Sequence, residues 1–491
     1  MRKINFKLCM LKGISAAISI LLCLSALVSC GNTSTDSDFG MTDSDSAKQT
    51  EPLQTEAPQP ETIVLHGGNP DNAVWAEAYL KSLPDADYDG ASFFITSPET
   101  VLFDPSEVKY MSEVIYARNK AVEEKYNIKI GCGKSDISSM LDGAAAAVNS
   151  GMYYSDIMSI PMEYVGEFAV SGVLENLRSL PFLDLSEPYF NASSVNALSA
   201  GDMIYGAAGE STPSLSAMPV VYFNKTLLSS VTETSPYDDA LRGELTWDKL
   251  LEYAALADGA DGIAGAAVSE GDVSDIVFAS AGEKFINSAE RTVPTVGFAD
   301  GAMDAPAPYV RKMFDLGDKN GISRADASAA FREGSVMFTV GYLSDISSYL
   351  SESVSLGILP IPKISADAPY RSLVNGTAPV MTVMKGPANS SMVSLTLSAI
   401  NAASYGYIAE KYVDYLHITA LPDNRSAYVL EEINRSAVYD LSSAFHSVYP
   451  EIWDNTRGLV RNVIERGDFS GYAAHVSAAE KAMASAFPCR E

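Results

Sequence analysis

The 491-residue sequence is poor in residue types that several classes of protein require. It has five cysteines, too few for a disulfide framework, and four histidines without metal-ligand spacing such as H-E-x-x-H. Lys and Arg number 34 against 62 Asp and Glu, a formal charge of −28, with no basic stripe to contact phosphates. These shortages argue against a disulfide-rich scaffold and against nucleic-acid binding, and we expect no metal ion and no other cofactor.

Motifs of common enzyme classes are also missing. No G-x-S-x-G elbow is present, and the S-x-x-K match at Ser106–Lys109 lacks the accompanying S-D-N and K-T-G motifs. Neighbouring acids such as Glu123 and Glu124 point from different sides of a helix. Carboxylates from distant segments can still meet around a sugar, as glycosidases require. A surface glycan-processing enzyme therefore stays open as an alternative function.

The N-terminus carries the three parts of an export signal. Basic residues between Arg2 and Lys12 precede an apolar stretch from Ile14 to Val28, which is short for a membrane-spanning helix of roughly 20 residues. The run Leu27-Val28-Ser29-Cys30 resembles a bacterial lipobox. We expect residues 1–29 to be a lipoprotein signal peptide and Cys30 to carry the lipid anchor. The exported protein would then act on the outer face of the bacterial cell membrane.

The segment after Cys30 is too polar to fold by itself. Residues 31–62 are dominated by Ser, Thr, Asp, Gln, Glu and Pro. We expect residues 30–87 to form the lipidated cysteine and a disordered tether, with the folded region beginning near Tyr88. Removing the signal's four positive charges leaves a formal charge of −32 on the mature chain. With 47% hydrophobic residues, the remaining chain can bury a large core.

Beyond Tyr88, strand patterns alternate with helix patterns. Apolar runs predict strands at 91–96, 127–130, 156–160, 219–223, 335–340 and 356–360, and three-and-four spacing predicts helices at 108–126, 137–148, 247–256 and 324–332. From about Ser391 the chain is predicted to be mainly helical. Such alternation indicates an α/β fold with mostly parallel sheets. We expect Asp156 to close a hydrogen-bond network at its strand end and Trp247 to anchor a helix.

Five motifs, taken in order, resemble those of the extracellular solute-binding proteins of ABC importers, typified by maltodextrin-binding proteins. They span most of residues 88–487: Arg118–Ile128, Gly151–Met158, Gly201–Gly206 followed by Val220–Lys225, Leu245–Leu250 and Phe331–Phe338. The Gly201–Gly206 segment is similar to the family's "G-K-x-Y-x-x-P", but Gly206-Ala207-Ala208-Gly209 stands where the family has its proline. This departure and the presence of only three tryptophans argue against a long maltodextrin-like ligand.

The resemblance implies a two-lobe periplasmic-binding-protein fold of type II, whose lobes are joined by crossing hinge strands. The N-terminal lobe would comprise 88–218 and 353–388, and the C-terminal lobe 219–352 and 389–491. A ligand would lie between the lobes, near strand ends where backbone donors and helix N-termini converge. Closure about the hinge is a known motion of this class.

The resemblance also places candidate ligand-binding residues, all of types that suit a sugar. Carboxylates accept hydrogen bonds from hydroxyl groups, and aromatic rings cover the apolar face of the sugar ring. The candidates are Glu163, Tyr205, Glu210, Glu270, Asp272, Tyr342, Tyr449 and Trp453. Each also has a structural interpretation: an exposed acid at a helix start or loop, or an aromatic ring packed in the core.

The function implied is that of a monomeric, lipid-anchored substrate-binding protein, not an enzyme. It would bind a small solute reversibly, most simply a mono- or oligosaccharide, and deliver it to an ABC transporter permease. Besides the glycan-processing enzyme, an adhesion or sensor lipoprotein on the same fold is an alternative. The three differ in whether a small molecule binds and whether it is turned over.

Overall fold

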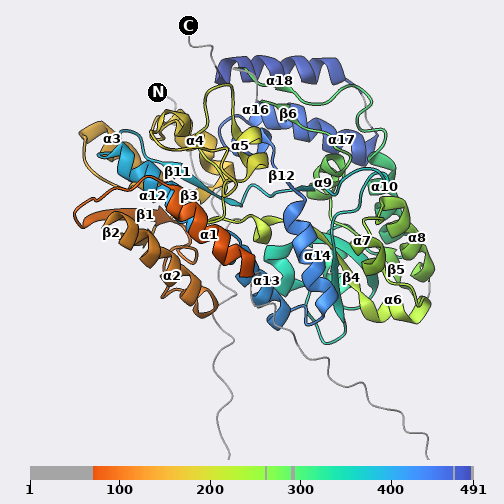
Figure 1. The fold of residues 1–491 in the computed structure, drawn as a ribbon. Coiled ribbons are helices and arrows are strands. Elements are labelled where there is room, and N and C mark those ends of the chain that lie inside the picture. The colour runs from red at the N-terminus through yellow and green to blue at the C-terminus, as the bar shows by residue number, and fades with distance from the viewer. Residues whose placement is uncertain (1–69, 260–261, 289–292, 468–469, 488–491) are drawn as a thin grey trace, which may run out of the picture. The chain divides into compact units, whose positions relative to one another are not determined.

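The computed structural model describes residues 70–259, 262–288, 293–467 and 470–487. The predicted signal peptide, Cys30 and residues 31–62 lie outside the described residues. Figure 1 shows the helices and strands with the labels used below. Among the helices that the structure describes, none is long and apolar enough to cross a membrane.

The first sheet has the strand order β11-β3-β1-β2. Its strands are β1 (Ala91–Ser97), β2 (Ile128–Lys134), β3 (Ile157–Pro161) and β11 (Pro379–Val383). β1 pairs in parallel with β2 and β3, whereas β11 is antiparallel to β3. The connections are α2 (Lys109–Tyr126) and α3 (Ile137–Ser150), the second capped by the Asp136 side chain and ended by Gly151 at φ 69°. The predicted strand–helix alternation is confirmed here.

The second sheet has the strand order β5-β8-β4-β9. Its strands are β4 (Pro219–Asn224), β5 (Ala264–Ala266), β8 (Val336–Tyr342) and β9 (Leu356–Leu359). All six residues of β4 are buried, as expected for a central strand covered on both faces. β4 is antiparallel to both β8 and β9, and only β5 pairs in parallel, with β8. The prediction of mostly parallel sheets is therefore wrong for this sheet.

The other elements between β3 and β9 are helices, helical turns and the antiparallel pair of short strands β6 and β7. They are α4 (Val165–Val170), α5 (Ala192–Leu198), α6 (Lys225–Val231), α7 (Pro236–Leu241), α8 (Trp247–Ala257), α9 (Asp272–Ser280), α10 (Ala307–Lys319), α11 (Ala327–Arg332), β6 (Ile286–Asn287), β7 (Thr295–Val296), η1 (Met162–Tyr164), η2 (Leu177–Ser179), η3 (Leu215–Ala217) and η4 (Leu343–Ser348). Trp247 is fully buried, and its indole donates a hydrogen bond to Ser280 Oγ (2.9 Å). The helix-anchoring role predicted for Trp247 is confirmed.

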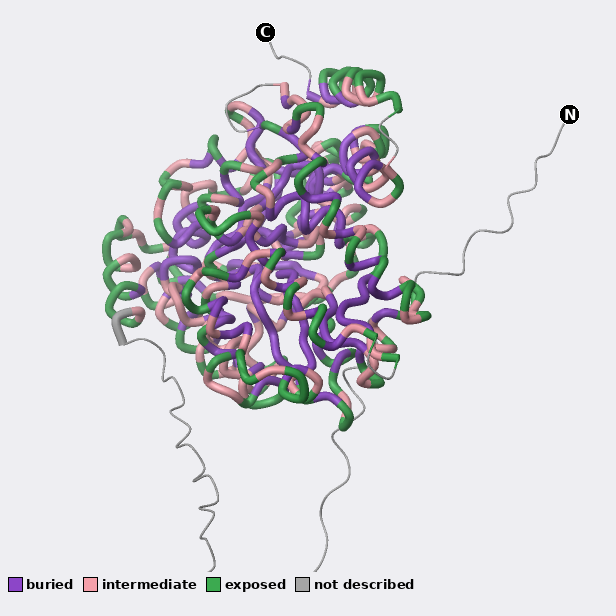
Figure 2. The backbone as a smooth tube through the Cα atoms, turned by 90° about the vertical axis from the view of Figure 1, so that its right-hand side faces the viewer, coloured by how far each residue is buried: buried purple, intermediate pink, exposed green. Residues whose placement is uncertain are grey.

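The C-terminal part is mainly helical, as predicted. It comprises α12 (Ser390–Ala403), α13 (Tyr407–Thr419), α14 (Asn424–Arg435), α15 (Leu441–Ala444), α16 (Pro450–Trp453), the π-helical turn η5 (Asp454–Gly458), α17 (Leu459–Arg466) and α18 (Tyr472–Ala486), with the short strands β10 (Ser372–Leu373) and β12 (Ala437–Val438) pairing in parallel. In Figure 2 the buried residues follow the interior strands, and exposed residues lie along the outer helices.

Regular structure begins before the predicted end of the tether at residue 87. The chain is helical in α1 (Pro70–Ser82), within the span 30–87 that we expected to be disordered. The ring of Tyr79 packs edge-on against Tyr189 (5.8 Å) and Tyr405 (5.1 Å), and Asn72 Nδ2 donates to Glu410 Oε1 (2.6 Å). Aromatic contacts to residues far along the chain hold α1 in place, a cause that local composition does not reveal.

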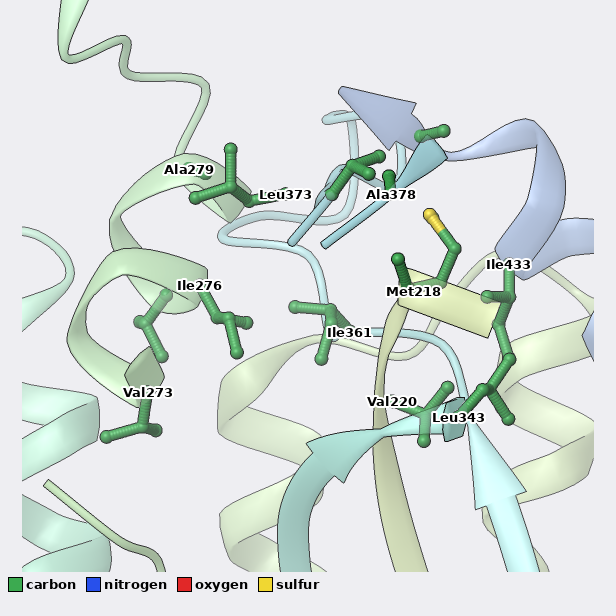
Figure 3. Close-up of a cluster of buried hydrophobic side chains, with 14 of the residues drawn as sticks. Met218, Val220, Val273, Ile276, Ala279, Leu343, Ile361, Leu373, Ala378 and Ile433 are labelled. Atoms are coloured by element: carbon green, nitrogen blue, oxygen red, sulfur yellow. The ribbon is translucent and has the colours of Figure 1, made fainter. Parts of the chain in front are cut away.

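Three segments meet between the two sheets. Asn375 N–H donates to Ala217 O (3.0 Å), and Val374 N–H donates to Val438 O (2.9 Å). Figure 3 shows the apolar cluster at this point, with Met218 close to Ala378 and Val220 close to Leu343. The segment 353–388 supplies β9 to the second sheet and β11 to the first. The lobe boundaries stay a prediction, but this segment serves both sheets rather than the first alone.

Candidate functional site

Glu163 follows the carboxyl end of β3 and is held by the segment that leads into β11. Its N–H donates to Gly376 O (2.9 Å), and the N–H of the preceding Met162 donates to Ala378 O (2.8 Å). A Cβ on Gly376 would lie 3.1 Å from Glu163 Cβ, so the glycine allows this close approach. Burial raises the pKa of the half-buried Glu163 carboxyl group. Partial desolvation of this kind strengthens hydrogen bonds to an uncharged ligand.

The opposite, amino end of β3 is held by Asp156, as predicted. Its Oδ2 accepts hydrogen bonds from Phe94 N–H (2.8 Å) and from the Tyr153 hydroxyl (2.7 Å). Burial raises the pKa of Asp156. This carboxylate therefore joins β1 to the start of β3, and the role predicted for it is confirmed.

Tyr342 is the last residue of β8 in the second sheet, and its ring is half-buried. Its carbonyl accepts a hydrogen bond from the Tyr222 hydroxyl (2.7 Å), which fixes the backbone at this point. Burial raises the pKa of Tyr342, the nearby Asp272 charge adds to the increase, and a hydrogen bond with Asn375 opposes it. Because Asn375 precedes Gly376, one loop links Tyr342 of the second sheet to Glu163 of the first.

The acids predicted at 270 and 272 have different surroundings. Asp272 begins α9 and pairs with Arg461 Nη2 (2.8 Å), which also binds Asp275 Oδ2 (2.6 Å). Glu270 is exposed and pairs with Arg324 (2.9 Å). The Asp272 charge contributes to the raised pKa of Tyr342.

Trp453 ends α16 and already has several partners. Its ring lies 4.0 Å from the His446 ring, and the Arg457 and Arg461 guanidinium carbons lie 4.7 and 5.5 Å from the ring centroid. Arg457 also lies over Phe285 (4.7 Å). The cation–π contacts suit a ring that positions both arginines. Tyr449 directly precedes α16, and its ring lies 6.0 Å from that of Phe445.

Two predicted residues lie among other elements. The Tyr205 hydroxyl contacts Met203 Sδ (3.8 Å). Glu210 Oε2 accepts a hydrogen bond from Gly406 N–H (3.0 Å), and the Glu210 N–H donates to Tyr189 O (3.0 Å). Burial raises the pKa of Glu210 to about 7. These bonds join Glu210 to the start of α13. Glu163 and Tyr342 are instead connected through the loop at Asn375, and Arg461 connects Asp272 to Trp453.

The residues that sequence reasoning missed are those that connect the others: Asp275, Asn375, Arg457 and Arg461. Asp272 and Asp275 are three residues apart on α9, and Arg457 and Arg461 are four apart. Such spacing places each pair on one helix face, a signal that could have found them. No sequence rule would have paired the two helices. In the part of the chain that the structure describes, no group of three or more His, Cys, Asp or Glu is arranged to hold a metal ion.

Solved structures share this fold. The cyclic α-maltosyl-1,6-maltose binding protein from Arthrobacter globiformis is 16% identical, with a TM-score of 0.56 over 81% of this chain and 99% of that one. The galacto-N-biose/lacto-N-biose I-binding protein of the ABC transporter from Bifidobacterium longum, in complex with lacto-N-biose, is 14% identical, with a TM-score of 0.50 over 82% and 98%. Both support the predicted two-lobe α/β fold of the maltose-binding type.

Sequence comparison assigns the family. No curated protein sequence matches the chain. The model of the family described as "Bacterial extracellular solute-binding protein" matches residues 117–396, which is more than half of the sequence. The match includes β2 to β5, β8, β9, β11 and the first half of α12, and with them Glu163, Asp272 and Tyr342. The chain therefore belongs to the family of bacterial extracellular solute-binding proteins.

Proposed function

We propose that this protein is the lipid-anchored substrate-binding component of an ABC importer and that its solute is a carbohydrate. The observation that carries the proposal is the link from Glu163 through the loop at Asn375 and Gly376 to Tyr342. This link joins a carboxylate beside the first sheet to an aromatic ring at the end of the second. Carboxylates and aromatic rings are the two groups that sugar recognition requires. The two structural relatives with named sugars add support at the level of fold.

The charges around this site favour an uncharged ligand. Arg461 binds Asp272 and Asp275, and Arg457 binds Asp275 as well. The two cations are thus matched by two carboxylates, which leaves Glu163 to accept hydrogen bonds from ligand hydroxyl groups. Arg461 would hold Asp272 in one orientation, so that its second oxygen can accept from the ligand. Closure of the lobes would then bury the solute before transfer to the permease.

Membrane attachment is proposed through Cys30, which lies outside the described residues. Replacing Cys30 with alanine should release the protein from the membrane fraction, because the acyl chains that would hold it could no longer attach. Fractionation of cells followed by immunoblotting measures this. The Cys9→Ala variant is the matched control and should stay in the membrane fraction. Continued membrane attachment of Cys30→Ala would overturn the assignment of the anchor.

The ligand class is tested by thermal shift with protein purified in detergent, against sugars, amino acids and short peptides. A ligand at a hundred times its Kd stabilises the folded state by about 2.7 kcal/mol. A hit among sugars, without release of product from a chromogenic glycoside, is the expected result. Turnover would favour the glycan-processing enzyme, and no stabilisation by any small molecule would favour the adhesion or sensor protein.

The site residues are tested by titration calorimetry with the sugar that binds. Tyr342→Ala and Glu163→Gln should each weaken binding at least tenfold, about 1.4 kcal/mol, because each removes a contact in a partly dehydrated site. Tyr116→Ala is the matched control, since Tyr116 is 60% exposed on α2. Unchanged affinity in either site variant would remove that residue from the site.

A further inference from the structure

A cavity of about 300 Å³ lies at the carboxyl ends of β1 and β3. Because these strands are parallel, their ends meet at the same edge of the first sheet. Apolar side chains form most of the wall: Val101, Met111, Ile160, Leu215 and Ile408, with the rings of Tyr110 and Tyr412. Met111, Ile160, Leu215 and Ile408 are each at most 2% exposed, so the wall is part of the protein core.

The cavity lies beside the two segments that carry Glu163 and Gly376 of the proposed sugar site. Pro161 and Thr377 belong to its wall, and each lies close in sequence to a residue of that site. Pro161 precedes the turn that carries Glu163, and Thr377 follows Gly376, whose carbonyl accepts the Glu163 N–H. A ligand held at Glu163 would therefore lie near this apolar cavity.

The wall chemistry is unsuited to another sugar ring. Moving a hydroxyl group from water into such a place without a partner costs roughly 1–3 kcal/mol in proteins, so a polyhydroxylated ring would be rejected. Five polar residues also line the cavity: Ser97, Glu99, Ser159, Ser216 and Thr377. The buried Ser159 hydroxyl lies in the wall, and among the described residues nothing hydrogen-bonds to it. These polar groups lie among a majority of apolar side chains, so they can satisfy a few polar atoms of a largely apolar group but not all the hydroxyl groups of a second sugar ring.

We propose that the ligand is a glycoside with an apolar aglycone, an aromatic ring or a group of that size, which this cavity receives while the sugar occupies the site at Glu163 and Tyr342. The volume is sufficient, because cavities of about 150 Å³ already bind benzene. This inference rests on the proposed function and specifies its substrate class. The driving force is removal of the aglycone from water, with Tyr110 and Tyr412 offering ring contacts.

The test compares matched methyl and phenyl glycosides of glucose, galactose, mannose and N-acetylglucosamine, in both anomers, by titration calorimetry with the full-length protein. The phenyl glycoside of the preferred sugar should bind at least tenfold more tightly than the methyl glycoside. Val101→Phe should reduce this ratio to about one, because the larger side chain fills the cavity, while binding of the methyl glycoside is kept. Val74→Phe is the matched control, since Val74 is 65% exposed on α1.

Further variants keep the test decisive if Val101→Phe does not fold. Tyr110→Ala removes a wall ring and should also lower the ratio, whereas Ser159→Ala should preserve it. Equal binding of methyl and phenyl glycosides by the unmodified protein would overturn this inference and leave the proposed function intact. If none of the glycosides binds, the proposed sugar-binding function fails and this inference fails with it.

Discussion

Replacing Asp275 with alanine tests whether a buried ion pair organises the region around Trp453. The Arg457 side chain is 7% exposed and the Asp275 side chain 3% exposed, with 3.3 Å between Arg457 Nη1 and Asp275 Oδ2. Arg457 Nε also donates to Ser442 Oγ (2.8 Å), and the guanidinium lies against the rings of Phe285 and Trp453. In Asp275→Ala the guanidinium would keep its hydroxyl and ring partners but lose its buried counter-ion.

The expected loss is about 3–5 kcal/mol in the free energy of unfolding, since a buried charge without its partner cannot recover its hydration. Asp272→Ala is the matched control, because it breaks a pair with the same Arg461 at a site where the Asp272 side chain is 54% exposed. That loss should be below about 1 kcal/mol. The double variant Asp275→Ala/Arg457→Met should recover part of the stability, since both charges are then absent.

Urea-induced unfolding followed by circular dichroism measures these differences. The comparison is valid when the dependence of the unfolding free energy on urea concentration has the same slope in all variants. Sugar affinity should decrease more in Asp272→Ala than in Asp275→Ala, because Asp272 is the proposed ligand contact. Equal and small losses of stability in Asp275→Ala and Asp272→Ala would refute the reasoning, because Arg457 would then not depend on Asp275.

Two further predictions concern Glu210 and Gly166. Burial raises the folded-state pKa of Glu210 from 4.5 to about 7, so the folded state binds the proton more tightly than the unfolded state does. The stability that this protonation provides is therefore complete below about pH 4.5 and is lost as the pH rises through 7. Between pH 5 and pH 8 the free energy of unfolding, measured with urea, should decrease by at most about 3 kcal/mol because of this group. This decrease should be absent in Glu210→Gln. An identical decrease in the variant would show that other groups cause it. Gly166→Ala should destabilise by about 1–3 kcal/mol, because the new Cβ would lie 2.6 Å from both Ala444 O and Phe445 Cδ1. Gly458→Ala is the control, since the new Cβ would meet no atom closer than 3.7 Å and Gly458 has a helical φ of −58°. Thermal unfolding should show no loss of stability in this control. A Gly166→Ala protein as stable as the parent would contradict the packing argument.

Much of the fold could be predicted because local patterns act over short distances. The spacing of Met111, Ile115 and Val122 buries one face of α2, and Thr246 caps α8 through a hydrogen bond from Lys249 N–H (3.3 Å). The strand direction in the second sheet could not be predicted in this way. Whether β4 runs parallel or antiparallel to β8 depends on how distant segments cross, and neither strand's own composition records it.

The candidate site, too, could be predicted in part from the sequence and in part only from the tertiary structure. The sequence by itself determined that acids and aromatic residues follow strand ends, as Glu163 follows β3 and Tyr342 ends β8, because strand periodicity and the family resemblance both depend on residue order. Only the tertiary structure decided which of them meet. The loop at Asn375 joins those two residues, and the Asp275–Arg457 pair connects α9 to η5 across 182 positions of sequence. Such contacts arise from packing of the whole chain, which is also why Glu210 is joined to α13.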